Sequence, residues 1–243
     1  MNAAPIGIFD SGVGGLTVKE KITELLPCEN IIYYGDTAHF PYGIKTREEV
    51  TGYARAISRY LIGRGVKAIV IACNTATAIA CETLRRECCV PVIGVINAGA
   101  RSAASASESG IIGVIATEGT VKSEAYPTAI HRIRPEAVVI QKACTKFVPL
   151  VEEGKCDTQE ARDAADEYLT ELCGKGIDTL VLGCTHFPYL SKIISEKMGE
   201  NVQLIDTACE TAAELKELLI KEELLNDSGI PGTREIIMSG QES

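Results

Sequence analysis

Two apolar stretches of this chain each end at a cysteine that also begins a helical pattern. Residues 66–72 (VKAIVIA) are apolar and β-branched, as expected for a strand covered on both faces, and Cys73 follows directly. Residues 177–183 (IDTLVLG) have the same character, and Cys184 follows them. Polar residues and then a helix-like stretch come after each cysteine. The repeat predicts two similar halves, each of which offers one thiol at the start of a helix.

Strand-like and helix-like patterns alternate along the whole chain, which predicts a mostly parallel sheet flanked by helices in each half. We expect an α/β fold of two similar domains, formed by residues 1–97 plus 207–243 and by residues 98–206. Ligands of such sheets bind beyond the carboxyl ends of the strands, so we expect the active site in the cleft between the domains. Further expectations are a helix over 46–64 capped by Thr46, a loop over 144–154 and a helix over 207–225.

Composition excludes several classes of protein. The net charge of −9 and the lack of a basic cluster argue against a nucleic-acid surface. We expect no signal peptide and no membrane span, because the chain starts without a basic segment and has no run of about 18 apolar residues. The ten cysteines are therefore expected to be reduced in the cytoplasm. With no Cys-x-x-Cys pair, a structural zinc site is not expected.

Two thiols that face each other suit one reaction: one removes a proton from a carbon atom and the other returns a proton on the opposite face. A free cysteine is only about 3% thiolate at pH 7, and a helix N-terminus lowers a thiol pKa. Asp10 and His186 each end a strand in one half, so they are candidates to exchange protons with the thiols. Segments 10–15, 72–77 and 183–189 contain no Lys or Arg, which favours substrate carboxylates held by hydroxyls, amides and backbone N–H groups.

The motifs FDSGVGG (9–15), GDTAHFPYG (35–43), ACNTAT (72–77), FVPLVEEG (147–154) and GCTHFPYL (183–190) resemble the glutamate racemases of the cofactor-independent aspartate/glutamate racemase family. The resemblance implies that Cys73 serves D-glutamate and Cys184 serves L-glutamate as acid and base. It also implies no cofactor and no metal, a cytoplasmic enzyme whose product feeds peptidoglycan synthesis, and often a homodimer. Asp10, Glu152 and His186 would assist proton transfer. The implied substrate-binding residues are Asp10, Ser11, Pro41, Tyr42, Gly43, Asn74, Thr75, Thr185 and His186.

Other interpretations of the same residues stay open. An aspartate racemase or related isomerase would share the fold, because loop lengths do not fix the length of the substrate side chain. A binding protein without turnover is an alternative from another class, which the presence of both cysteines disfavours. A metal site at Cys184 and His186 lacks a third ligand nearby in the sequence. Asp10 could only cap a helix, Tyr42 could only pack, and Glu152 could lie in a solvated turn.

Overall fold

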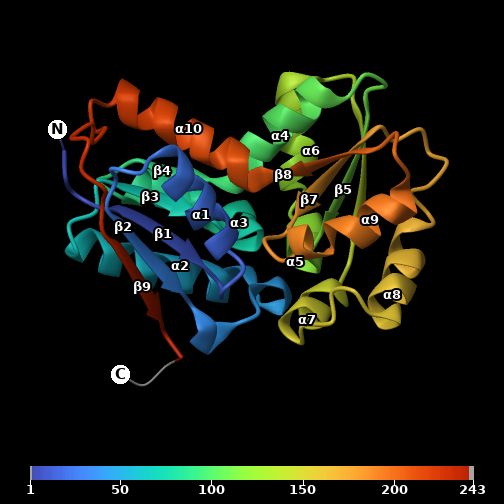
Figure 1. Ribbon diagram of the computed structural model, residues 1–243, viewed down its shortest axis with the longest axis horizontal. Coiled ribbons are helices and arrows are strands. Elements are labelled where there is room, and N and C mark those ends of the chain that lie inside the picture. The colour runs from blue at the N-terminus through green and yellow to red at the C-terminus, as the bar shows by residue number, and fades with distance from the viewer. Residues whose placement is uncertain (1, 241–243) are drawn as a thin grey trace. The chain divides into compact units, whose positions relative to one another are not determined.

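The computed structural model describes residues 2–240, and within it the chain divides into two compact units. The first unit takes in the chain up to Val95 and from Ala208 onward, and the second unit is Ile96–Thr207. Figure 1 labels most of the helices and strands of both units. We describe each unit by itself.

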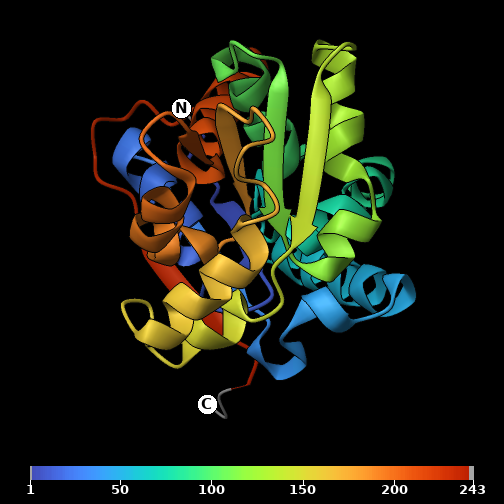
Figure 2. The ribbon, with the colours of Figure 1, turned by 90° about the vertical axis from the view of Figure 1, so that its right-hand side faces the viewer.

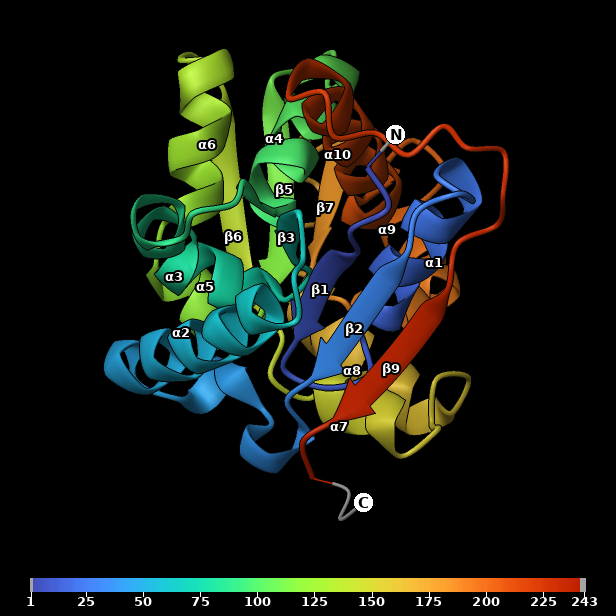
Figure 3. The ribbon, with the colours of Figure 1, turned by 90° about the vertical axis from the view of Figure 1, so that its left-hand side faces the viewer.

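The first unit contains a five-stranded parallel sheet with the strand order β4-β3-β1-β2-β9. Figure 3 shows β3, β1 and β2 of this sheet, with the red strand β9 at one edge. Its elements, in chain order, are β1 (Ile6–Asp10), α1 (Leu16–Leu25), β2 (Ile31–Gly35), the 3₁₀ turns η1 (Thr37–His39) and η2 (Tyr42–Ile44), α2 (Arg47–Gly63), β3 (Ala68–Ile71), α3 (Asn74–Glu87), β4 (Val92–Gly94), most of α10 (Thr207–Lys221) and β9 (Arg234–Met238).

Both faces of this sheet are covered, because successive side chains of a strand point to opposite faces. Ile8 of β1 and Val70 of β3 pack in one core with α1 and α10. Phe9 and Ile71 pack in the other core with α2 and α3. Near-continuous apolar strands are what a sheet buried on both faces requires.

The second unit contains a four-stranded parallel sheet with the order β6-β5-β7-β8. In Figure 2, β5 is the green strand and β6 the yellow-green strand beside it. Its elements are most of α4 (Val95–Ala106), β5 (Ile111–Ala116), α5 (Glu118–Lys122), α6 (Ala125–Ile133), β6 (Val138–Ala143), α7 (Phe147–Glu152), α8 (Gln159–Leu169), β7 (Thr179–Gly183), the 3₁₀ turn η3 (Phe187–Leu190), α9 (Ser191–Met198) and β8 (Gln203–Asp206).

The two sheets share one topology, as the repeated cysteine junctions predict. In the first sheet, β1 pairs with β2 and β3, and β3 pairs with β4. In the second sheet, β5 pairs with β6 and β7, and β7 pairs with β8. The orders β2-β1-β3-β4 and β6-β5-β7-β8 are therefore equivalent, and β9 is an additional edge strand of the first sheet. The predicted α/β fold with two parallel sheets is confirmed.

Several local predictions need correction. The segment expected as a loop over 144–154 contains the helix α7, and the helix expected over 207–225 ends at Lys221. The strand β9 was not predicted. The prediction for Thr46 is confirmed: its hydroxyl accepts a hydrogen bond from the Glu49 amide, and the Glu49 carboxylate accepts one from the Thr46 amide.

None of the helices within residues 2–240 combines the length and the apolar character that crossing a membrane requires.

Candidate active site

In the first unit, Asp10 lies at the carboxyl end of β1, and its carboxylate is fully buried. Its Oδ2 atom accepts hydrogen bonds from the backbone N–H groups of Gly12 and Gly15, each at 3.1 Å. The hydroxyl of Tyr33, on the neighbouring strand β2, donates to the carbonyl oxygen of Gly12 at 2.7 Å. These bonds fold the glycine-rich loop 10–15 around the carboxylate. Asp10 is not itself the N-cap residue of α1, which is Gly15.

Cys73 is the N-cap residue of α3, and only 6% of its surface is exposed. Its sulfur accepts a hydrogen bond from the Ala76 backbone N–H at 3.4 Å, and its thiol donates to the Ser11 hydroxyl at 3.8 Å. β3 pairs with β1 so that Ile71 lies opposite Phe9, and the N–H of Ala72 donates to the carbonyl oxygen of Phe9 at 2.8 Å. The strand pairing is what brings Cys73 beside Ser11 and Asp10.

Burial, and after it the nearby Asp10 carboxylate, raise the pKa of the Cys73 thiol to about 12, although hydrogen bonds with Ala76 and Ser11 lower it in part. The sequence-based expectation of a lowered pKa at this helix N-terminus is therefore wrong for the protein without substrate. A thiolate here would lose its hydration and would face a like charge, and these two costs exceed what the hydrogen bonds with Ala76 and Ser11 offer. Cys73 rests as a thiol.

The remaining predicted residues of this unit lie at the same edge of the sheet or in the loop after β2. Asn74 and Thr75 are buried in the first turn of α3. Pro41 and Gly43 are half-buried on either side of Tyr42. The Tyr42 hydroxyl donates to Asp36 Oδ2 at 2.6 Å, and burial together with this bond raises the pKa of Tyr42. The Tyr42 hydroxyl thus donates its proton to Asp36, so residues 41–43 would contact a ligand through their backbone groups.

In the second unit, Cys184 directly follows β7 and is 7% exposed. Its sulfur lies 3.9 Å from Nδ1 of His186, and Nε2 of the same ring lies 2.5 Å from Oε1 of Glu152. His186 is almost fully buried, whereas 36% of the Glu152 side chain is exposed. Thr185 is buried between Cys184 and His186. A thiol, an imidazole and a carboxylate in a row can pass a proton from the sulfur toward solvent.

Glu152 reaches His186 because α7 carries it there. This helix covers one side of the second core, where Phe147 packs edge-on against Phe187 with ring centroids 5.1 Å apart. Phe187 follows His186 in the chain, so the aromatic contact joins the two segments that supply the hydrogen-bonded pair.

Sequence reasoning missed Asp36. It follows Gly35 at the end of β2, next to Asp10 at the end of β1, and is 2% exposed. A carboxylate directly after a buried strand, at the edge where Asp10 stands, is a signal that could have identified it.

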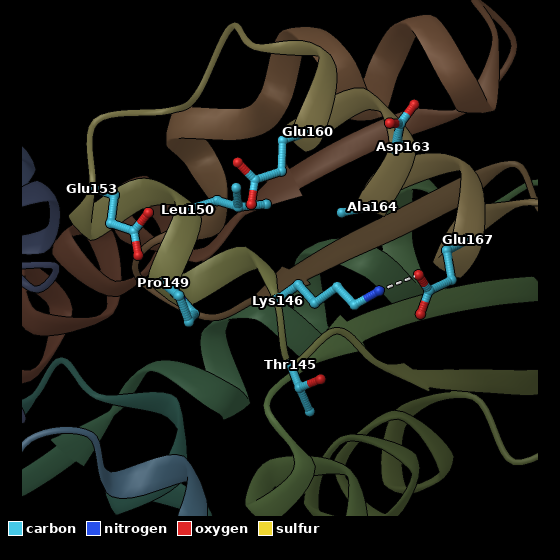
Figure 4. A pocket seen from close by; sticks show the side chains of 9 residues that line it. All are labelled: Thr145, Lys146, Pro149, Leu150, Glu153, Glu160, Asp163, Ala164 and Glu167. Atoms are coloured by element: carbon cyan, nitrogen blue, oxygen red, sulfur yellow. Dashed lines mark hydrogen bonds and ion pairs between the residues drawn. The ribbon is translucent and has the colours of Figure 1, made fainter.

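A pocket of about 400 Å³ lies between α7 and α8 in the second unit and is shown in Figure 4. Its lining includes four carboxylates, but Lys146 pairs with Glu167, and Lys155 pairs with Glu153 and Glu160. None of the predicted site residues lines it. It is lined by Thr145, Lys146, Pro149, Leu150, Glu153, Glu160, Asp163, Ala164 and Glu167.

Across the part of the chain that the structure describes, no three His, Cys, Asp or Glu side chains gather in an arrangement that could hold a metal ion.

The comparisons agree with this architecture. A family model described as Asp/Glu/Hydantoin racemase matches residues 6–215. A glutamate racemase of Geobacter metallireducens is 51% identical over 96% of this chain and 87% of its own length. The crystal structure of glutamate racemase isoform RacE1 from Bacillus anthracis superposes with a TM-score of 0.96 at 38% identity, covering 99% of this chain and 90% of that one.

A third relative was solved with an amino acid bound. The structure of glutamate racemase from Francisella tularensis in complex with D-glutamate has a TM-score of 0.93 and 37% identity, and it covers 100% of this chain and 90% of its own. With a family model that spans most of the chain and relatives of nearly full length, the chain belongs to the Asp/Glu/Hydantoin racemase family and is an amino-acid racemase.

Proposed function

We propose that this enzyme interconverts L- and D-glutamate by a two-cysteine mechanism without a cofactor. One observation carries the proposal: equivalent strand ends in two sheets of equal topology each present a buried cysteine beside a group able to exchange its proton. The substrate named for the relatives, which are up to 51% identical to this chain, supports glutamate. The units divided near residues 97 and 207 would enclose the amino acid, with its α-carbon between Cys73 and Cys184.

The reaction begins on L-glutamate at Cys184. His186 accepts the Cys184 proton, which leaves a thiolate whose imidazolium partner is hydrogen-bonded to Glu152. The thiolate takes the α-proton, and the carbon receives a proton from the Cys73 thiol on the opposite face. D-glutamate leaves with Cys184 as a thiol and Cys73 as a thiolate. A proton from solvent then returns to Cys73, with the Asp10 carboxylate able to relay it, and His186 gives up the proton that it took from Cys184. The reverse reaction starts with Cys73 as the thiolate and Cys184 as the thiol.

The two thiols start from unlike environments, which suits opposite roles. Burial and the Asp10 charge raise the pKa of Cys73, so that this group rests as the proton donor. Cys184 has an imidazole within 3.9 Å that can take its proton. Cys73 can therefore act as the acid while Cys184, once His186 has taken its proton, acts as the base, and no proton needs to pass between the two sulfur atoms.

Neutral donors would hold the two substrate carboxylates. Ser11, Asn74 and Thr75 lie around Cys73, and Thr185 lies beside Cys184. The first backbone N–H groups of α3 add donors that favour an anion. Neutral dipoles can stabilise charge that develops on the α-carbon without neutralising the attacking thiolate.

The test is racemisation of pure L- and D-glutamate, followed by chiral chromatography, with L- and D-aspartate compared under the same conditions. We expect glutamate to turn over with the higher kcat/KM. A preference for aspartate would identify the alternative, an aspartate racemase of the same fold. Absence of turnover on both, together with tight binding of an amino acid, would identify a binding protein instead.

The family resemblance also leads us to propose the setting of the reaction. The D-glutamate would supply peptidoglycan synthesis in the cytoplasm, and the enzyme would act as a homodimer. Complementation of a D-glutamate auxotroph and a measurement of molecular mass in solution test these two points.

A further inference from the structure

We propose that Asp36 is a positioning residue that holds the substrate-binding loop 41–43, and that the C-terminal strand β9 locks it in place through Ser239. This inference rests on the proposed function, because the resemblance to glutamate racemases is what implies that residues 41–43 bind the substrate. It adds two residues, one from the chain's C-terminal segment, to the support of the site.

The Asp36 carboxylate collects side chains from three places. Its Oδ2 atom accepts the Tyr42 hydroxyl proton at 2.6 Å, and its Oδ1 atom accepts the Ser239 hydroxyl proton at 2.7 Å. Nδ1 of His39 lies 2.9 Å from both oxygen atoms. Hydrogen bonds to a buried carboxylate are the strong kind, and a carboxylate has enough lone pairs to accept all three.

The backbone of Asp36 is tied to the catalytic edge of the sheet. Its N–H donates to the carbonyl oxygen of Asp10 at 2.9 Å. The same residue therefore contacts Asp10 through its main chain and Tyr42 through its side chain. A shift of Asp36 would move the loop relative to the Asp10 end of β1.

Ser239 fastens the other side of this loop. Its hydroxyl accepts the Ala38 backbone N–H at 3.0 Å while donating to Asp36, and its own N–H donates to the Gly35 carbonyl at 3.0 Å. The next residue, Gly240, donates its N–H to the Thr37 hydroxyl at 2.9 Å. The chain thus continues past β9, which pairs with β2 as far as Met238, and its next two residues hold the start of the loop. No motif in the sequence connects residue 239 with residue 42.

A packing role alone would need no buried charge at this position. The neighbouring rings of His39, Tyr42 and Tyr53 already stack, with centroids 4.0 Å apart for His39–Tyr53 and 5.7 Å for Tyr42–Tyr53. The Asp36 carboxylate fixes the orientation of the Tyr42 side chain by accepting its hydroxyl proton, and it thereby fixes the position of the 41–43 backbone.

The experiment compares Asp36→Asn, Ser239→Ala and Tyr42→Phe with the wild-type enzyme in steady-state racemisation of both glutamate enantiomers. We expect Asp36→Asn to raise KM about tenfold and to change kcat much less, because the loop binds substrate and does not transfer the proton. Ser239→Ala should raise KM about threefold. The double variant Asp36→Asn/Tyr42→Phe should be no worse than Asp36→Asn alone, because both changes break one contact.

Two controls separate positioning from general damage. Tyr53→Phe keeps the ring stacked on His39, and Ser228→Ala removes a hydroxyl that serves only the local turn at Ile230 in the C-terminal segment. Both should keep the wild-type KM. Unchanged KM in Asp36→Asn, or a loss confined to kcat, would overturn the inference. If Asp36→Asn fails to fold, Ser239→Ala and Tyr42→Phe decide it by the same criterion.

A second readout does not depend on racemisation. Hydrogen exchange at the Ala38 amide should accelerate in Ser239→Ala and Asp36→Asn and stay unchanged in Ser228→Ala. Unchanged exchange in the first two variants would overturn the inference even if KM rose. If the wild-type enzyme does not racemise glutamate, the proposed function fails, and the exchange experiment still tests whether Asp36 and Ser239 hold the loop.

Discussion

Nε2 of His186 lies 2.5 Å from Oε1 of Glu152, while Nδ1 of the same ring faces Sγ of Cys184 at 3.9 Å. The imidazole therefore stands between a sulfur atom that must gain and lose a proton and a carboxylate that is 36% exposed to solvent. In this order the groups can carry a proton between the buried thiol and water.

Glu152→Gln keeps the shape of this side chain and removes its charge. We expect kcat/KM to fall at least tenfold, since positioned acid and base groups typically contribute more than that. The fall must be equal for L- and D-glutamate, because two enantiomers have the same free energy in water. Initial rates from both directions check this, and Glu153→Gln, whose carboxylate pairs with Lys155, is the matched control expected to stay at the wild-type rate.

Asp10→Asn should have opposite effects on the reactivity of Cys73 and on catalysis. The Asp10 charge raises the pKa of the Cys73 thiol, so its removal lowers that pKa. At a fixed pH near 9, alkylation of Cys73 by iodoacetamide should become faster, while racemisation becomes slower. Site-resolved mass spectrometry measures the alkylation, with Cys81 in the same protein as the reference. Slower or unchanged alkylation of Cys73 would contradict the electrostatic assignment.

The raised pKa of Cys73 also predicts how stability changes with pH. Between an ordinary thiol pKa near 9 and the value of about 12 in the folded protein, the unfolded chain has lost a proton that the folded chain keeps. Stability is therefore fully present below pH 9 and is lost as pH rises toward 12. Cys73→Ser removes this titrating group, so the free energy of unfolding of the variant should fall less steeply with pH than that of the wild-type protein. The two slopes should differ by about 1.4 kcal/mol per pH unit.

Urea unfolding at several pH values between 9 and 11 measures these slopes. Cys89→Ser makes the same change at an exposed position and should retain the wild-type slope. Equal slopes for Cys73→Ser and the wild-type protein would show that the Cys73 thiol does not keep its proton in this range.

Gly15→Ala tests how tightly the glycine-rich loop encloses Asp10. A Cβ atom at this position would lie 2.6 Å from the Asp10 Cβ and 2.9 Å from the Ala72 Cβ, closer than carbon atoms approach. We expect a loss of about 1–3 kcal/mol in stability and a lower racemisation rate. Gly52→Ala, on α2 with no atom within 4 Å of the added Cβ, should instead stabilise by about 0.5–1 kcal/mol. Thermal unfolding of both variants decides this.

The sequence predicts those elements in which several neighbouring residues indicate the same local structure. Cys73 and Cys184 stand at strand ends that the apolar runs identify, and Thr46 with Glu49 forms the expected capping box. β9 has an exposed and partly charged pattern, typical of an edge strand, so no apolar run marks it. The Cys73 pKa depends on how completely the thiol is buried and on Asp10, 63 positions away in the sequence, which only the strand pairing reveals.

Residues that hold the site in place, such as Asp36 and Ser239, were harder to predict than the two cysteines. Asp36 lies in the motif GDTAHFPYG (35–43), from which only Pro41, Tyr42 and Gly43 were predicted as site residues. Its hydrogen bond to Ser239 joins positions about 200 residues apart in the sequence. Glu152 was placed by resemblance alone, and α7, where it stands, was expected to be a loop. Tertiary packing of Phe147 against Phe187 decides that local structure.

The most direct test of the two-thiol account is isotope exchange at low conversion in D₂O. Each enantiomer of glutamate is incubated separately, and the recovered substrate and the product are separated and analysed by mass spectrometry. Because one sulfur removes the α-proton and another delivers the new one, the account predicts one deuterium in the product and protium in the recovered substrate. Deuterium that appears early in the recovered substrate would contradict it, since a single base would then both remove and return the proton on one face.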